Sequence, residues 1–192
     1  DEGMATGVLY FDADGVEQFQ AASVVIVACN GVGTPRLLLN SASARHPDGL
    51  ANSSGMVGKN LMFHPYASIY GYFDHEMDGY RGPPIGTWSQ EFYETDLTRG
   101  FVRGYTFQIN RGQGPVTTAY TGMRTGKIPW GADHHRAFRQ IFCHNAGMVA
   151  ICEDLPEAHN TVTLDPTLKD ADGIPAPKTT YTLSENSRRM MA

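Results

Sequence analysis

The chain has 192 residues, 41% of them hydrophobic, and a formal net charge of −5. This composition excludes a disordered chain, and the length suffices for one large domain or two modest ones. Lys and Arg are scattered along the sequence, which argues against a nucleic-acid partner, because that needs a concentrated basic face. No run of about eighteen apolar residues occurs, so we expect no transmembrane segment. Nothing in the sequence indicates a compartment.

Three strands are predicted in the first thirty residues. Residues 7–11 and 16–20 flank Asp-Ala-Asp-Gly at 12–15, whose side-chain acceptors and glycine suit a hairpin turn. Residues 23–29, Ser-Val-Val-Ile-Val-Ala-Cys, are apolar without alternation. Such a strand is typically buried on both faces, as in a parallel sheet covered by helices on both sides.

A glycine-containing turn and a helix are predicted after this strand. The turn is Asn-Gly-Val-Gly at 30–33, Thr34 is expected as the N-cap, and Pro35 as the first helical residue. A strand, a turn and a capped helix make half of a βαβ unit. The G-x-G-x-x-G fingerprint is incomplete, because Arg36 stands at its third glycine. The residues leave open whether the turn faces a cofactor or is only structural.

From about residue 44 the sequence changes to loops rich in Gly and Pro between strand-like stretches. The expected elements are strands at 66–73, 100–109, 142–151 and 160–164, a short helix at 133–140, a proline-containing loop from 165, an extended stretch at 181–183, and a final helix opened by Ser184 and Glu185. We therefore predict two domains, residues 1–60 and 61–192. The fold class is α/β for the first and α+β with a mainly antiparallel sheet for the second.

No catalytic or metal site follows from the residues. The histidines and cysteines lack metal-ligand spacing, so we expect no metal site. His64, before a proline, is expected to be a hydrogen-bonded structural histidine. The carboxylates at 153–157 are expected to form a solvated turn, not a glycosidase pair. Cys29, Cys143 and Cys152 each lie among apolar residues and are expected to be buried free thiols.

Residues 23–43, SVVIVACNGVGTPRLLLNSAS, resemble a characteristic segment of the glucose–methanol–choline (GMC) oxidoreductases. The resemblance continues through GLANSSGMVGKNLM at 49–62 and, in order, through shorter segments at 153–156, 160–165, 172–175 and 181–186. The sequence of these segments is most similar to bacterial members of the gluconate dehydrogenase type. The chain departs from the usual pattern at Asn30-Gly31, where Gly-Ala is commoner, at Ala42-Ser43, and at Phe63, where many members have Asp.

The resemblance implies part of a Rossmann-like FAD-binding domain at 1–60 and a substrate-binding domain, incomplete at its C-terminal end, at 61–192. It implies a longer flavoprotein that oxidises CH–OH groups of alcohols, polyols or sugar acids by hydride transfer to flavin N5. The implied partners are a small alcohol or sugar substrate and an electron-acceptor subunit linked to a cytochrome or quinone. The implied FAD contacts are Ala28, Cys29, Asn30 and Gly31.

The family's N-terminal G-x-G-x-x-G segment and its C-terminal catalytic histidine have no counterpart in these residues. We therefore assign no catalytic residue and expect the chain alone to be inactive. The alternative is a non-catalytic carbohydrate-binding or interaction domain that retains only the substrate-domain fold. The substrate, the electron acceptor and the oligomeric state stay open at this stage.

Overall fold

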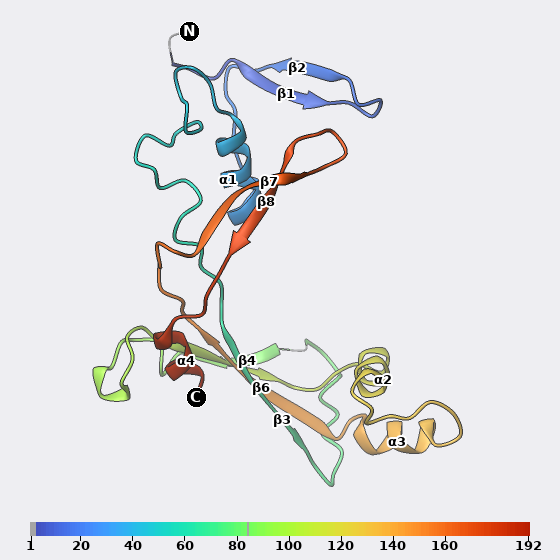
Figure 1. Cartoon of the computed structure of the whole chain (residues 1–192). Helices are drawn as coiled ribbons and strands as arrows, with labels where there is room; N and C mark the ends of the chain where they lie inside the picture. The colour runs from blue at the N-terminus through green and yellow to red at the C-terminus, as the bar shows by residue number, and fades with distance from the viewer. Residues whose placement is uncertain (1–2, 84) are drawn as a thin grey trace. The chain divides into compact units, whose positions relative to one another are not determined.

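The computed structural model describes residues 3–83 and 85–192 (Figure 1). The chain divides into two compact units, the first made of Asp1–Met62 with Pro156–Thr182 and the second of Phe63–Leu155 with Leu183–Ala192. The predicted ranges, 1–60 and 61–192, have a single boundary, whereas the structure groups residues 156–182 with the first unit. The assignment of these ranges to cofactor and substrate domains stays a prediction.

The first unit begins with the predicted hairpin, which is confirmed. Strand β1 (Gly7–Phe11) pairs with β2 (Glu17–Ala21) in antiparallel register. The Asp12 carboxylate accepts the N–H groups of Asp14 (3.0 Å) and Val16 (2.9 Å), and Gly15 has φ 73°. These bonds, that from Val16 above all, lower the pKa of Asp12.

The prediction of a buried parallel strand at 23–29 is wrong for this structure. These residues form no strand, and Val24 and Ile26 are 75% and 85% exposed. A parallel strand requires a neighbouring strand at hydrogen-bonding distance. All the paired strands of the described residues are antiparallel, and none of them includes this segment. This apolar segment therefore pairs with no strand of the described residues.

Helix α1 (Asn30–Asn40) and the hairpin of β7 (Thr161–Lys169) and β8 (Pro175–Thr180) complete the first unit. The proline-containing loop expected from residue 165 is instead part of this hairpin, which corrects the prediction. Pro175 begins β8, a position where the missing N–H is tolerated in a two-stranded sheet with open edges.

The second unit contains a four-stranded antiparallel sheet of order β3-β6-β5-β4, which confirms the predicted mainly antiparallel sheet. Its strands are β3 (Tyr66–Tyr72), β4 (Ile85–Ser89), β5 (Tyr105–Asn110) and β6 (Asn145–Cys152). Its helices are the 3-10 turn η1 (Leu97–Arg99), α2 (Pro115–Arg124), α3 (His134–Ile141) and α4 (Glu185–Met191). Strand β4 and helix α2 were not foreseen from the sequence.

One face of this sheet packs on α4. Ala150 and Cys152 of β6 and Met190 of α4 form a buried cluster. As predicted, Ser184 opens the helix: its side chain accepts the Ser187 N–H at 3.0 Å. Side chains alternate along a strand. Tyr70 and Tyr72 of β3, which pair with Gly147 and Asn145 of β6, therefore lie on the opposite face from Ala150.

The predicted burial of three thiols is correct only in part. Cys152 is buried, Cys143 is intermediate, and Cys29 is exposed, because the strand that was expected to bury it does not form. Burial raises the pKa of the Cys152 thiol. His64, expected as a structural histidine, is exposed. Among the described residues, no helix has the length and apolar character needed to cross a membrane, and no three His, Cys, Asp or Glu residues gather as metal ligands.

Candidate cofactor-facing turn at the start of helix α1

The four residues proposed to contact FAD lie together where the extended segment joins α1. Ala28 and Cys29 precede the helix, and Asn30 and Gly31 are its first two residues. All four are exposed. Their contact with FAD stays a prediction, and their accessibility is the property that such a contact requires.

Asn30, the first residue of α1, supplies the side-chain acceptor for the first turn, and not Thr34 as the sequence predicted. The Asn30 Oδ1 atom accepts the N–H groups of Val32 (2.9 Å) and Gly33 (3.0 Å), the two and three residues ahead of it. Its φ is 60°, a left-handed conformation that asparagine tolerates better than most residues. Thr34 Oγ1 instead accepts the N–H of Cys29 at 3.2 Å. The helix therefore begins four residues before the expected cap, and Pro35 falls inside it.

The two glycines of the turn have different roles. A Cβ atom on Gly33 would lie 3.0 Å from the Cβ of Cys29, so this position requires a small residue. A Cβ on Gly31 would meet no atom within 4 Å, so the surface above it is open. The first turn of α1 contains no acidic residue. An open helix N-terminus without carboxylates is electrostatically suited to an anionic group.

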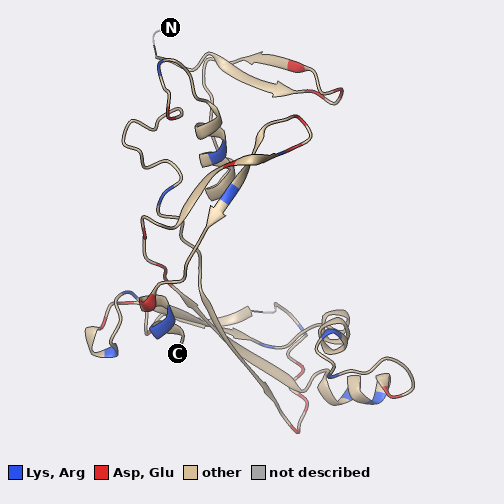
Figure 2. Ribbon diagram, viewed as in Figure 1, with Lys and Arg blue, Asp and Glu red and all other residues tan. Residues whose placement is uncertain are grey.

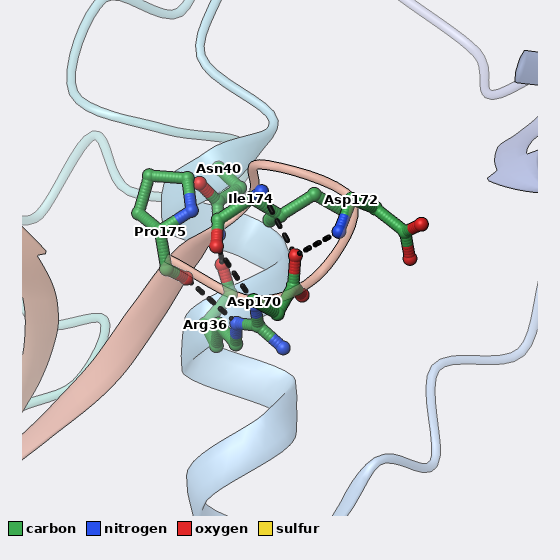
Figure 3. Close-up of polar contacts among 6 residues, drawn as sticks. All are labelled: Arg36, Asn40, Asp170, Asp172, Ile174 and Pro175. Carbon is green, nitrogen blue, oxygen red and sulfur yellow. Dashed lines mark hydrogen bonds and ion pairs between the residues drawn. The ribbon is translucent and has the colours of Figure 1, made fainter. Parts of the chain in front are cut away.

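Arg36 holds α1 against the turn that joins β7 and β8 (Figure 3). Its guanidinium donates from Nε to the carbonyl of Pro175 (2.8 Å) and from Nη2 to Asp170 Oδ2 (2.6 Å) and the carbonyl of Ile174 (3.3 Å). The side chain of Arg36 is 27% exposed and that of Asp170 35%. The bond from Arg36 is the main cause that lowers the pKa of Asp170.

This network explains why an arginine stands at the third glycine position of the incomplete fingerprint. In a dinucleotide fingerprint the third glycine allows close packing of helix and strand. Here the same position carries a long side chain that reaches a hairpin 134 residues further along the chain. Sequence reasoning missed the pair, because the separation of Arg36 and Asp170 leaves no local signal.

Comparison with known proteins places these features in a family. Residues 1–66 match the family model described as GMC oxidoreductase. The chain is 43% identical over 190 residues to 2-methyl-1,2-propanediol dehydrogenase of Mycolicibacterium austroafricanum, an alignment that covers 96% of this chain and 34% of that protein.

Two further relatives align over nearly the whole chain. The fructose dehydrogenase large subunit of Gluconobacter japonicus is 28% identical over 97% of this chain and 34% of its own length. The gluconate 2-dehydrogenase flavoprotein of Pantoea cypripedii is 28% identical over 99% of this chain and 32% of its own length. The chain thus spans about a third of the length of these relatives. The resemblance read from the sequence is confirmed, and the chain belongs to the GMC oxidoreductase family.

Proposed function

We propose that this chain is part of an FAD-dependent dehydrogenase that oxidises a CH–OH group of an alcohol, polyol or sugar acid. The observation that carries the proposal is the alignment of 96% of the chain with 2-methyl-1,2-propanediol dehydrogenase at 43% identity. The other two relatives, a fructose dehydrogenase subunit and a gluconate 2-dehydrogenase, agree with a hydroxyl-bearing substrate.

The residues at the start of α1 fit a bound FAD. Gly31 leaves open space, no carboxylate lies in the first turn, and Ala28, Cys29 and Asn30 are exposed beside it. Asn30 Oδ1 already accepts two N–H groups, which leaves the Nδ2 amide of the same side chain as a donor. These residues would hold FAD, which would supply the acceptor for a hydride removed from the substrate. The role of this chain is to hold the turn in place. Asn30 does so through its bonds to the first turn of α1, and Arg36 does so by fixing α1 to the β7–β8 turn.

The exposed apolar segment before α1 supports the same proposal. Val24 and Ile26 present large apolar surfaces, and neither belongs to a strand of the described residues. We propose that strands from the remaining two thirds of the longer protein pair with residues 23–29 there and complete a parallel sheet. An electron-acceptor partner, linked to a cytochrome or quinone, belongs to the same proposal.

The test compares Asn30→Leu with Asn30→Asp in the longer natural protein. Asp keeps the side-chain acceptor for the helix cap and lacks the Nδ2 donor, whereas Leu removes both. We expect both variants to lower the FAD content, measured by flavin absorbance per protein, and Leu to lower it more. Unchanged FAD content and flavin potential in Asn30→Leu would contradict the assignment of this turn.

A second measurement concerns the 192-residue chain alone. Since neither a parallel sheet nor a catalytic histidine is assigned within it, we expect it to bind FAD poorly and to show no dehydrogenase activity. Tight stoichiometric binding of FAD by this chain would show that it forms the cofactor site without the rest of the protein. Carbohydrate binding by the longer protein without any flavin would instead support the non-catalytic alternative.

A further inference from the structure

A hollow of about 400 Å³ lies in the second unit, on the face of the sheet opposite α4. Tyr70 and Tyr72 of β3 line it, together with residues of α2 and of the segment that follows α2. Tyr72 pairs with Asn145 of β6, which also lines the hollow. The volume is within the range of pockets that hold small molecules.

The charges that line this hollow are all positive. Arg124 and Lys127 line it, and no Asp or Glu does. The recorded ion pairs of the described residues include neither cation. Figure 2 shows Arg and no acidic residue in helix α2. Two cations without a carboxylate partner favour an anionic ligand.

Lys127 is held in place before any ligand arrives. Its ammonium group donates to the Tyr72 hydroxyl at 2.8 Å and lies 4.4 Å from the centre of the same ring. The next residue, Ile128, is 1% exposed and donates its N–H to the Gly122 carbonyl at 3.0 Å. A Cβ on Gly122 would overlap the Ile128 side chain, so the close contact depends on glycine. The segment that carries Lys127 is therefore clamped to α2, which lowers the entropy cost of binding.

The rest of the lining is uncharged and contains both apolar groups, such as Ile141 and the tyrosine rings, and polar ones. Gln113, Thr121 and Thr125 supply amide and hydroxyl groups beside the two cations. Such groups donate to and accept from the hydroxyls of a ligand, while Arg and Lys bind its carboxylate. We propose that this hollow binds a small polyhydroxylated carboxylate, that is, a sugar acid. The inference rests on the proposed function for the ligand's role and narrows its substrate class.

The test is calorimetric titration of the full chain, without FAD, using gluconate as the probe and sorbitol as its neutral counterpart. We expect gluconate to bind at least tenfold more tightly than sorbitol. We expect Lys127→Met to weaken the binding of gluconate at least tenfold. Lys178→Met, which removes one charge from β8 in the first unit, is the matched control and should bind as the wild type does. Equal binding of gluconate and sorbitol, or an equal loss in Lys178→Met, would overturn the proposal.

Inorganic phosphate is the second probe. Binding of phosphate as tightly as gluconate would show a general anion site and overturn the sugar-acid assignment. The gluconate titration contains no flavin, so a negative result would not contradict the predicted FAD contact of Asn30. Unchanged FAD content in the Asn30 variants would likewise not contradict the proposed sugar-acid site.

Gly122→Ala tests the clamp without changing charge. It should displace Ile128 and weaken gluconate binding, whereas Gly114→Ala, where a Cβ meets nothing within 4 Å, should not. Far-UV circular dichroism verifies that each variant folds. If Gly122→Ala fails to fold, Arg124→Gln replaces it, with the same expected loss. Wild-type affinity in folded Gly122→Ala or in Arg124→Gln would contradict the proposal.

Discussion

The tetrapeptide Asp-Ala-Asp-Gly occurs twice, at 12–15 and at 170–173, and both copies form the same hairpin turn. In each copy, Oδ1 of the first aspartate accepts the N–H groups two and four residues ahead, at 3.0 and 2.9 Å from Asp12 and at 3.1 and 2.9 Å from Asp170. The glycines have φ 73° and 78°. The turn is thus a local property of four residues.

The two turns differ in what the second carboxylate oxygen contacts. Asp12 Oδ2 accepts from Gln18 of its own hairpin at 2.9 Å, whereas Asp170 Oδ2 accepts from Arg36 of α1 at 2.6 Å. The pKa of both carboxyls is lowered, mainly by a backbone N–H at Asp12 and mainly by the guanidinium at Asp170. The same four residues therefore stabilise only a hairpin in one place and an interface between a hairpin and a helix in the other.

The largest effect expected from this difference is that of Arg36→Met. It removes three hydrogen bonds from a partly buried guanidinium and should destabilise the β7–β8 turn by about 2 kcal/mol. Hydrogen exchange of the Ile174 amide measures the loss, since that amide donates to Asp170. Gln18→Met is the matched control in the first hairpin and should cost no more than about 0.5 kcal/mol at the Val16 amide. Equal losses at the two amides would contradict the distinction between the turns.

The glycines should behave alike. Gly15→Ala and Gly173→Ala each force a side chain into a left-handed conformation with no steric contact around it, and each should cost about 1 kcal/mol. Hydrogen exchange at Val16 and Ile174 again provides the measurement. Asparagine at the same positions should cost less, because it tolerates this conformation. A clearly larger loss at Gly173 would show that the tertiary contact, and not the turn itself, sets the cost.

The smallest effect is the dependence of stability on pH. Both aspartates have a lowered pKa in the folded state, so their contribution is present above the unfolded pKa of about 3.9 and is lost as the pH falls through the folded value. We expect Asp170→Asn to reduce the acid sensitivity of the Ile174 amide, and Arg36→Met to do the same with the carboxylate intact. Asp12→Asn should reduce the acid sensitivity of hydrogen exchange at the Val16 amide and leave that of the Ile174 amide unchanged. A pH profile at Ile174 that is unchanged in Arg36→Met would refute the role given to the guanidinium.

The sequence predicted the first hairpin, the antiparallel sheet, and the final helix, because these depend on turn residues, β-propensity and a serine cap. It failed for the second copy of the tetrapeptide, where Pro175 and Pro177 indicated a loop although both are tolerated in an open two-stranded sheet. It failed at residues 23–29, since the pattern shows that a segment is suited to a buried strand without supplying the neighbouring strand. The four proposed FAD contacts are exposed at the start of α1 and stay a prediction, whereas the side-chain acceptor of the first turn was misassigned to Thr34.

The sequence by itself determined the family, the turn at the first Asp-Ala-Asp-Gly, and which residues, 28–31, are proposed to face the cofactor. These depend on residues that are adjacent in the chain, whose backbone preferences act locally. Only the tertiary structure decided that Arg36 reaches Asp170, and that Arg124 and Lys127 line one hollow with Tyr70 and Tyr72 of β3 and no carboxylate. Such pairings depend on which surfaces pack together, and the free energy that selects them comes from contacts between residues far apart in sequence.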